Sequence, residues 1–238
     1  MLAITSTENL TGAHISGDYW DLDELLTAIK TVIGERNHYL DYEAARERLL
    51  QFCIQLRNGI DGEKHIEFIA NGINDGILKR HELLAPKKNI YYAIDCLIPE
   101  VAFVALALND FISLYTKRAQ LLLDPAIATI RKFQMSITSF LKEVLDEQSY
   151  VQFEQQFQQQ QPVFFRYATQ FVDVLNIEYL KLTKEERAQR MAQFILSYTA
   201  NNPSYNALKQ QLLQVTSTSK QALHELPLKI EYPETIIW

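Results

Sequence analysis

The sequence predicts an α+β protein that is predominantly α-helical. We expect a helical body around an apolar central helix, with one small, mainly antiparallel sheet. The run from Val101 to Leu108 is apolar at every position, and a helix that is apolar on all sides is buried on all sides. Most of the remaining chain repeats apolar residues at helical spacing. The few segments with strand character lie in the N-terminal, middle and C-terminal parts of the chain, so the sheet is expected to combine strands from all three.

Length and composition match a soluble globular protein. The 238 residues are 47% hydrophobic and 22% charged, which fits a single domain over residues 1–238. The formal net charge of -6 repels phosphate backbones, so we expect no nucleic-acid partner. The longest apolar run is shorter than the ~18 residues that a membrane span requires, and the first residues lack a signal-peptide pattern. We therefore expect a cytoplasmic location and no membrane contact.

The first part of the chain predicts a hairpin and then a helix. Residues 2–5 and 13–16 flank a polar turn, which favours a short β-hairpin. Asp21 is the expected N-cap of the first helix, because Glu24 follows it at the spacing of a capping box. Gly34 stands where a left-handed residue usually ends a helix.

An apolar stripe predicts a second helix over residues 41–56. Its charged residues, Glu43, Arg46, Glu47 and Arg48, are expected to face water, because the apolar stripe occupies the other side.

The middle of the chain predicts two strands and the central helix. Residues 65–70 alternate between two turn signals and therefore predict a strand. Residues 77–84 can form one or two helical turns. Residues 90–97 are rich in types that favour a pleated surface. They lead into the central helix, expected over residues 99–115, whose first turn holds a proline.

A series of helices and a final strand are expected after the central helix. Asp124 and Pro125 form a cap followed by a first-turn proline, and Thr183 begins a capping box. The alternating tail over residues 228–232 predicts a strand that pairs with the N-terminal hairpin. Helices are expected over residues 125–146, 149–160, 164–180, 184–198 and 203–215.

The motifs of known enzymes are absent from the sequence. There is no glycine-rich nucleotide loop and no nucleophile elbow. The five histidines do not stand at the spacings of metal-binding helices, and the isolated Cys53 and Cys96 are expected to be buried thiols. We therefore expect no metal and no cofactor.

One candidate cluster is acidic and aromatic and covers residues 17–24. Asp18 and Trp20 are its candidate ligand-binding residues. Its carboxylates have two explanations, which the sequence leaves open. They stabilise the N-terminus of the first helix, or they bind a ligand or a hard cation.

A second candidate cluster lies around the central helix. Glu100 and Asp110 stand at the two ends of its apolar run, and a charge in such surroundings requires a partner or a cavity. Tyr91 and Tyr92 project to opposite faces of their strand, so one of them can line the same cavity as Asp110. Both carboxylates also have a structural explanation, because a helix N-terminus stabilises Glu100 and a nearby Lys, Arg or Tyr can pair with Asp110.

Several separated patterns occur in one order along the chain: Gly17-Asp18-Tyr19-x-Asp21-Leu22-x-x-Leu25, Asn89-x-Tyr91-Tyr92, Pro99-Glu100, Ala107-Leu108-Asn109-Asp110-Phe111, Tyr167-Ala168-Thr169-Gln170 and Glu231-Tyr232-Pro233-x-x-Ile236-x-Trp238. With these patterns the chain resembles an uncharacterised bacterial protein family that is known only as a domain of unknown function. The resemblance spans nearly the whole chain and implies one domain. It implies no activity, cofactor or catalytic residue.

The sequence leaves two functions open. The leading hypothesis is a cytoplasmic, non-enzymatic structural or protein-interaction protein that forms a homodimer or binds a protein partner through a helical face. The alternative is a small-molecule-binding protein or an unrecognised enzyme. Its acidic and aromatic pocket would lie between the sheet and the central helix, with these candidate residues: Asp18, Trp20, Tyr91, Tyr92, Glu100 and Asp110.

Overall fold

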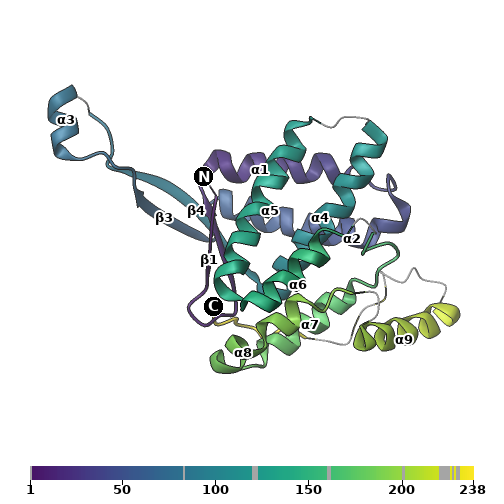
Figure 1. Cartoon of the computed structure of the whole chain (residues 1–238). Coiled ribbons are helices and arrows are strands. Elements are labelled where there is room, and N and C mark those ends of the chain that lie inside the picture. Colours follow the sequence, from purple (N-terminus) through teal and green to yellow (C-terminus); the bar gives the residue numbers. More distant parts are fainter. Residues whose placement is uncertain are drawn as a thin grey trace.

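The computed structural model describes residues 2–82, 84–119, 123–159, 162–199, 202–219, 226, 228 and 231–238. It confirms an α+β fold that is mainly helical (Figure 1). The elements in chain order are β1 (Ala3–Ser6), β2 (Gly12–Gly17), α1 (Tyr19–Ile33), a 3-10 turn (Leu40–Tyr42), α2 (Glu43–Ile60), β3 (His65–Ala70), α3 (Asp75–His81), β4 (Lys88–Leu97), α4 (Ile98–Ala119), α5 (Pro125–Val144), α6 (Glu147–Phe157), α7 (Gln170–Leu180), α8 (Lys184–Ile195) and α9 (Pro203–Ser219).

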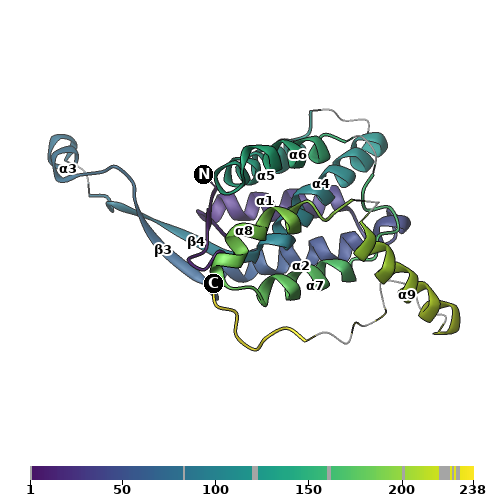
Figure 2. The same ribbon diagram turned by 60° about the horizontal axis from the view of Figure 1, so that its bottom comes forward.

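Helix α4 is the centre of the body, as the sequence predicts. Every residue from Val101 to Leu108 is buried, and α4 contacts α1, α2, α5, α7 and α8. Among the described residues, one helix is long and apolar enough to cross a membrane, Ile98–Arg118, and 72% of its most apolar window is buried inside the protein. Figure 2 shows α4 among the helices of the body, while α3 lies apart from them.

The sheet is antiparallel throughout, in the order β1-β2-β4-β3. Ile15 of β2 lies opposite Ile94 of β4, and both are buried with Cys96 in the core that the sheet shares with the helices. A close approach fixes α2 on this face, because a side chain at Gly59 would come within 2.7 Å of Ile94 Cγ2. The strand predicted over residues 65–70 is confirmed at both ends.

The described residues of the tail form no strand, so the described sheet consists of N-terminal and middle strands only. Residues 229 and 230 of the predicted tail strand lie outside the described residues. The tail still reaches the hairpin through side chains of its turn. Asn9 Nδ2 donates to the Trp238 carbonyl at 2.6 Å, and Thr11 Oγ1 donates to the Ile237 carbonyl at 2.6 Å.

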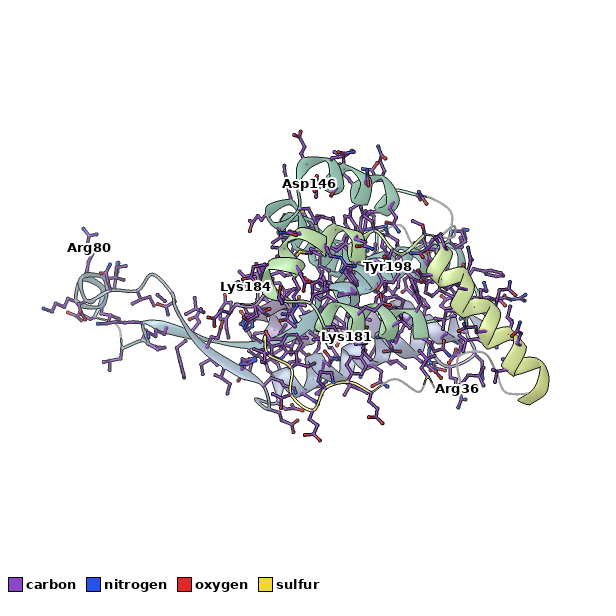
Figure 3. All side chains as sticks on the ribbon, turned by 90° about the horizontal axis from the view of Figure 1, so that it is seen from below. Arg36, Arg80, Asp146, Lys181, Lys184 and Tyr198 are labelled. Atoms are coloured by element: carbon purple, nitrogen blue, oxygen red, sulfur yellow. The ribbon has the colours of Figure 1, made fainter. Side chains whose placement is uncertain are left out.

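Strand β3, helix α3 and the first half of β4 project from the body as one extended segment, which we call the arm (residues 65–91). Figures 1 and 2 both show the arm pointing away from the helices, with α3 at its tip. Figure 3 places Arg80 at the far end of the arm and Tyr198 inside the body. Strand β2 pairs with β4 only from Tyr92 onward, so the rest of the arm is a two-stranded ribbon.

Two helix starts differ from the prediction by three residues or more. The N-cap of α1 is Asp18 rather than Asp21, and Asp21 occupies the third helical position and completes the capping box. Both residues are acidic caps at the right spacing, and the sequence alone does not rank them. The helix predicted from Phe164 begins only at Gln170, because Arg166 adopts a left-handed φ of 47° before it.

Candidate functional site

A cavity of about 680 Å³ lies where the sheet meets the helical body. We call it the Arg48 groove. Residues of α2, the end of β4, α7 and the tail line it. Its lining residues are Ala44, Glu47, Arg48, Gln51, Phe52, Gln55, Asn58, Lys64, His65, Ile94, Asp95, Cys96, Leu97, Glu100, Thr169, Asp173, Asn176, Tyr232, Ile236 and Trp238.

Arg48 joins three helices inside the groove. Its Nη2 lies 2.5 Å from Glu100 Oε2 of α4 and 3.0 Å from Asp173 Oδ1 of α7, and its Nε donates to Glu100 Oε1 at 2.8 Å. Burial alone would lower the pKa of Arg48, but Glu100 and Asp173 raise it well above its usual value. The guanidinium therefore stays charged, and the two carboxylates together exceed its charge by one.

A tyrosine and an asparagine extend this network. Asn176 Nδ2 donates to Glu100 Oε2 at 3.0 Å and to the Tyr232 hydroxyl at 3.1 Å. The Tyr232 hydroxyl donates to Asp173 Oδ1 at 2.8 Å, and burial together with Asp173 raises its pKa. The Asn176 side chain is buried, and its Oδ1 has no hydrogen-bond partner among the described residues. The groove wall therefore contains one unused acceptor.

The edge of β4 is open along the groove. Strand β3 covers β4 only as far as Ala93. Ile98 N donates to the Thr11 carbonyl at 3.4 Å, so the alternation of an antiparallel ladder directs the main chain of Cys96 and Ile94 toward β2. The N–H and C=O of Asp95 and the N–H of Leu97 then point to the groove, where no described strand pairs with them.

A histidine–carboxylate cluster lies at the base of the arm. His14 Nδ1 is 2.7 Å from Asp95 Oδ1, and His14 Nε2 is 3.1 Å from Glu67 Oε1. His65 Nε2 is 2.8 Å from Asp95 Oδ2. Carboxylates only accept, so both His14 contacts are hydrogen bonds only when the imidazole carries two protons. The hydrogen bond that His14 donates to Asp95 raises the pKa of His14 against the opposing effect of burial.

Of the six residues proposed from the sequence, Glu100 alone lines the Arg48 groove. Asp18 caps α1, where its carboxylate accepts from Asp21 N at 2.9 Å. Trp20 is 69% exposed. Tyr91 and Tyr92 lie on β4, opposite Glu67 and Ile66 of β3, and neither of them lines the groove.

Asp110 lines a second cavity of about 560 Å³ on the other half of α4. About 15 Å of helix axis separates it from Glu100 at 1.5 Å per residue. The Asp110 carboxylate is buried and accepts from Phe164 N at 2.8 Å. Burial raises its pKa to about 6. Glu100 and Asp110 therefore belong to separate sites.

The sequence reasoning missed most of the groove. Arg48, Asp173, Asn176 and Tyr232 were not candidates, and Arg48 was expected to face water. The structure corrects this expectation for three of the four charged residues of α2, since Glu43 and Arg46 are also buried and pair with each other at 2.8 Å. Glu47 is exposed, as expected. One sequence signal could have indicated buried charges on α2. This helix carries several charged residues although its apolar residues are not confined to one side.

The described residues of the groove offer charged and hydrogen-bonding groups to a ligand. Arg48, Asn176 and histidines contact the carboxylates of Asp95, Glu100 and Asp173. Among the described residues, no serine lines the groove. Cys96 is buried, and burial raises the pKa of its thiol well above the usual value. Within the described ranges, no group of three or more His, Cys, Asp or Glu side chains is arranged to hold a metal ion.

Comparisons with known proteins give one match. No curated protein and no solved structure matches the chain. One family model, described as a domain of unknown function (DUF6904), matches residues 2–238. The chain therefore belongs to the DUF6904 family.

Proposed function

We propose that this protein is a non-enzymatic interaction protein that binds a second copy of itself through the arm. The observation that carries the proposal is a two-stranded ribbon whose apolar face is about half exposed and is not covered by any other described element. The proposed location is the cytoplasm, where Cys53 and Cys96, both free and buried, would remain thiols.

One face of the ribbon is apolar. Ile66 lies opposite Tyr92, and Phe68 lies opposite Ile90, so these four side chains project to the same side. Ile66 and Ile90 are each 49% exposed and Phe68 is 61% exposed. Contiguous apolar surface of this kind on a soluble protein marks an interaction site.

The ribbon also lacks the support that such structures require. An isolated two-stranded hairpin is marginally stable in water, and a third strand or a packed helix is needed to hold it. Strand β2 is the third strand that supports β4, and it pairs with β4 only from Tyr92 onward. A protein partner on the arm would supply the rest.

The free edge of β3 suits a second copy of the same strand. His65, opposite Ala93, directs its main chain toward β4, so Ile66, Phe68 and Ala70 direct theirs outward. A two-fold axis at Phe68 places the two Phe68 residues opposite each other and Ile66 opposite Ala70 of the second copy. This register satisfies all the outward groups and joins the two apolar faces into one.

Charge favours the same arrangement. Residues 71–88, at the tip of the arm, contain four Lys or Arg and two Asp or Glu, a net charge of +2. The remaining chain contains 19 Lys or Arg and 27 Asp or Glu, a net charge of -8. Antiparallel pairing of two β3 strands carries each basic tip toward the acidic body of the other copy, which favours association.

Sedimentation velocity from low to tens of micromolar protein tests the proposal. We expect a dimer for the native sequence and a monomer for Phe68→Lys, because a lysine on each side of the axis places two charges in the apolar interface. Met135→Lys is the matched control, since Met135 is 63% exposed on the body. It should leave the dimer unchanged.

A monomeric native protein at tens of micromolar would overturn the proposal, and so would a Phe68→Lys dimer of unchanged affinity. Phe68→Pro is a second variant that keeps the β3–β4 ladder intact. It removes an outward N–H that β4 does not use, and proline is tolerated on edge strands for this reason. It should also give a monomer.

A further inference from the structure

We infer that the Arg48 groove binds an extended peptide segment that carries a lysine or arginine side chain. Three independent features of the groove lead to this ligand class: its length, the unpaired main-chain and amide groups along its sides, and its surplus of negative charge.

The groove has the length of a short extended chain. Its lining residues on α2 run from Ala44 to Asn58 at spacings of three and four, so they form one continuous face of the helix. These residues span about 21 Å of helix axis at 1.5 Å per residue. An extended peptide rises about 3.3 Å per residue, so the groove accommodates about six residues.

The sides of the groove offer hydrogen bonds that match a peptide main chain. The N–H and C=O of Asp95 lie on the open edge of β4, in the position where a further strand pairs. Asn176 of α7 also lines the groove, and its buried Oδ1 has no partner among the described residues. An unpaired buried acceptor is costly.

The charge of the groove selects a cationic side chain. Four carboxylates line it against two permanently cationic groups and one histidine: Glu47, Asp95, Glu100 and Asp173, with Arg48, Lys64 and His65. Arg48 neutralises only one of the two carboxylates that it contacts. Tyr232 and Trp238 are among the lining residues, and aromatic side chains attract ammonium and guanidinium groups. An anionic ligand would meet net repulsion here.

Fluorescence anisotropy with synthetic peptides tests this inference. The probe is a labelled six-residue peptide of alternating threonine and valine with one central arginine. We expect saturable binding of this peptide by the native protein, and about tenfold weaker binding when the arginine is replaced by glutamate, as for loss of a charge-assisted contact. N-methylation of alternate peptide amides should abolish binding, because it removes the main-chain donors.

Matched protein variants locate the site. Glu47 is exposed on α2 and lines the groove, whereas Glu178 is exposed on α7 and does not line it. Glu47→Gln should weaken binding of the arginine peptide about threefold, as for an exposed ion pair, and Glu178→Gln should leave it unchanged. Asp173→Asn should weaken it more than Glu47→Gln does.

Three results would overturn the inference. The first is equal affinity for the arginine and glutamate peptides, and the second is no binding of the arginine peptide at hundreds of micromolar. The third is equal binding of the peptide and of arginine amide alone, because the open strand edge would then contribute nothing.

Discussion

Strand β4 passes through the body and the arm, and the burial of its apolar face differs between these two regions. In the body, Ile94 and Cys96 flank the polar Asp95 and are buried under α2 and α4. In the arm, Ile90 lies on the same face of the same strand but is half exposed. The apolar face of the strand therefore continues through both halves, but described parts of the chain cover it only in the body half.

The largest expected effect separates the body from the arm. Phe103 of α4 is buried, and its ring centroid lies 4.8 Å from that of Phe164. Phe103→Ala should lower the free energy of unfolding by about 3–5 kcal/mol, because it leaves a cavity in a packed core. Phe68→Ala in the arm should cost under about 1 kcal/mol in the monomer. Urea denaturation of dilute protein measures both, and equal losses would refute the distinction.

Asp110 offers a second test, because the body buries a charge there. Its folded pKa of about 6 lies above the ordinary value for Asp, so its stabilising contribution is present at low pH and lost as pH rises through 6. Asp110→Asn should raise the free energy of unfolding at pH 7 by about 1–3 kcal/mol, since one pKa unit corresponds to about 1.4 kcal/mol. The gain should vanish near pH 4.

The base of the arm should respond to pH in the range set by His14. Its folded pKa is raised, so its contribution is complete below its ordinary value of 6.5 and is lost as pH rises through the higher folded value. His14→Gln should reduce the change in the free energy of unfolding across this pH range by about 1 kcal/mol. Thermal unfolding of both proteins at pH 6 and pH 8.5 measures the difference. An unchanged pH dependence would show that the cluster contributes nothing.

The smallest effect is expected at the tip of the arm. Ile77 of α3 is partly exposed, and no residue of α3 is buried. Ile77→Ser should change the free energy of unfolding of the monomer by less than about 0.5 kcal/mol. A larger loss in dilute protein would mean that the tip packs against something in the monomer.

Local signals were enough to predict most elements of this fold. The cap and proline at Asp124 and Pro125 start α5, and the capping box at Thr183 starts α8. The alternating segment over residues 65–70 forms β3. Each of these depends on residues within one or two turns of chain, which is why the sequence alone indicates them.

The candidate site could not be predicted in the same way. Arg48 pairs with Glu100 and Asp173, which follow it in the chain by 52 and 125 positions. Helical periodicity relates residues that are only three or four positions apart, so it cannot indicate such partners. From the sequence alone, a charged residue on α2 is therefore expected to face water. Glu100 was found because a charge beside an all-apolar run requires a partner. The arm was missed because alternation predicts a strand without indicating whether anything covers it.

Hydrogen exchange at single amides of β3, followed as a function of protein concentration, tests the central claim most directly. We expect the outward amides of Ile66, Phe68 and Ala70 to exchange rapidly in dilute protein and to become protected at tens of micromolar, while the inward amides stay protected throughout. Rapid exchange of the three outward amides at every concentration would contradict it, because the edge of the arm would then have no partner.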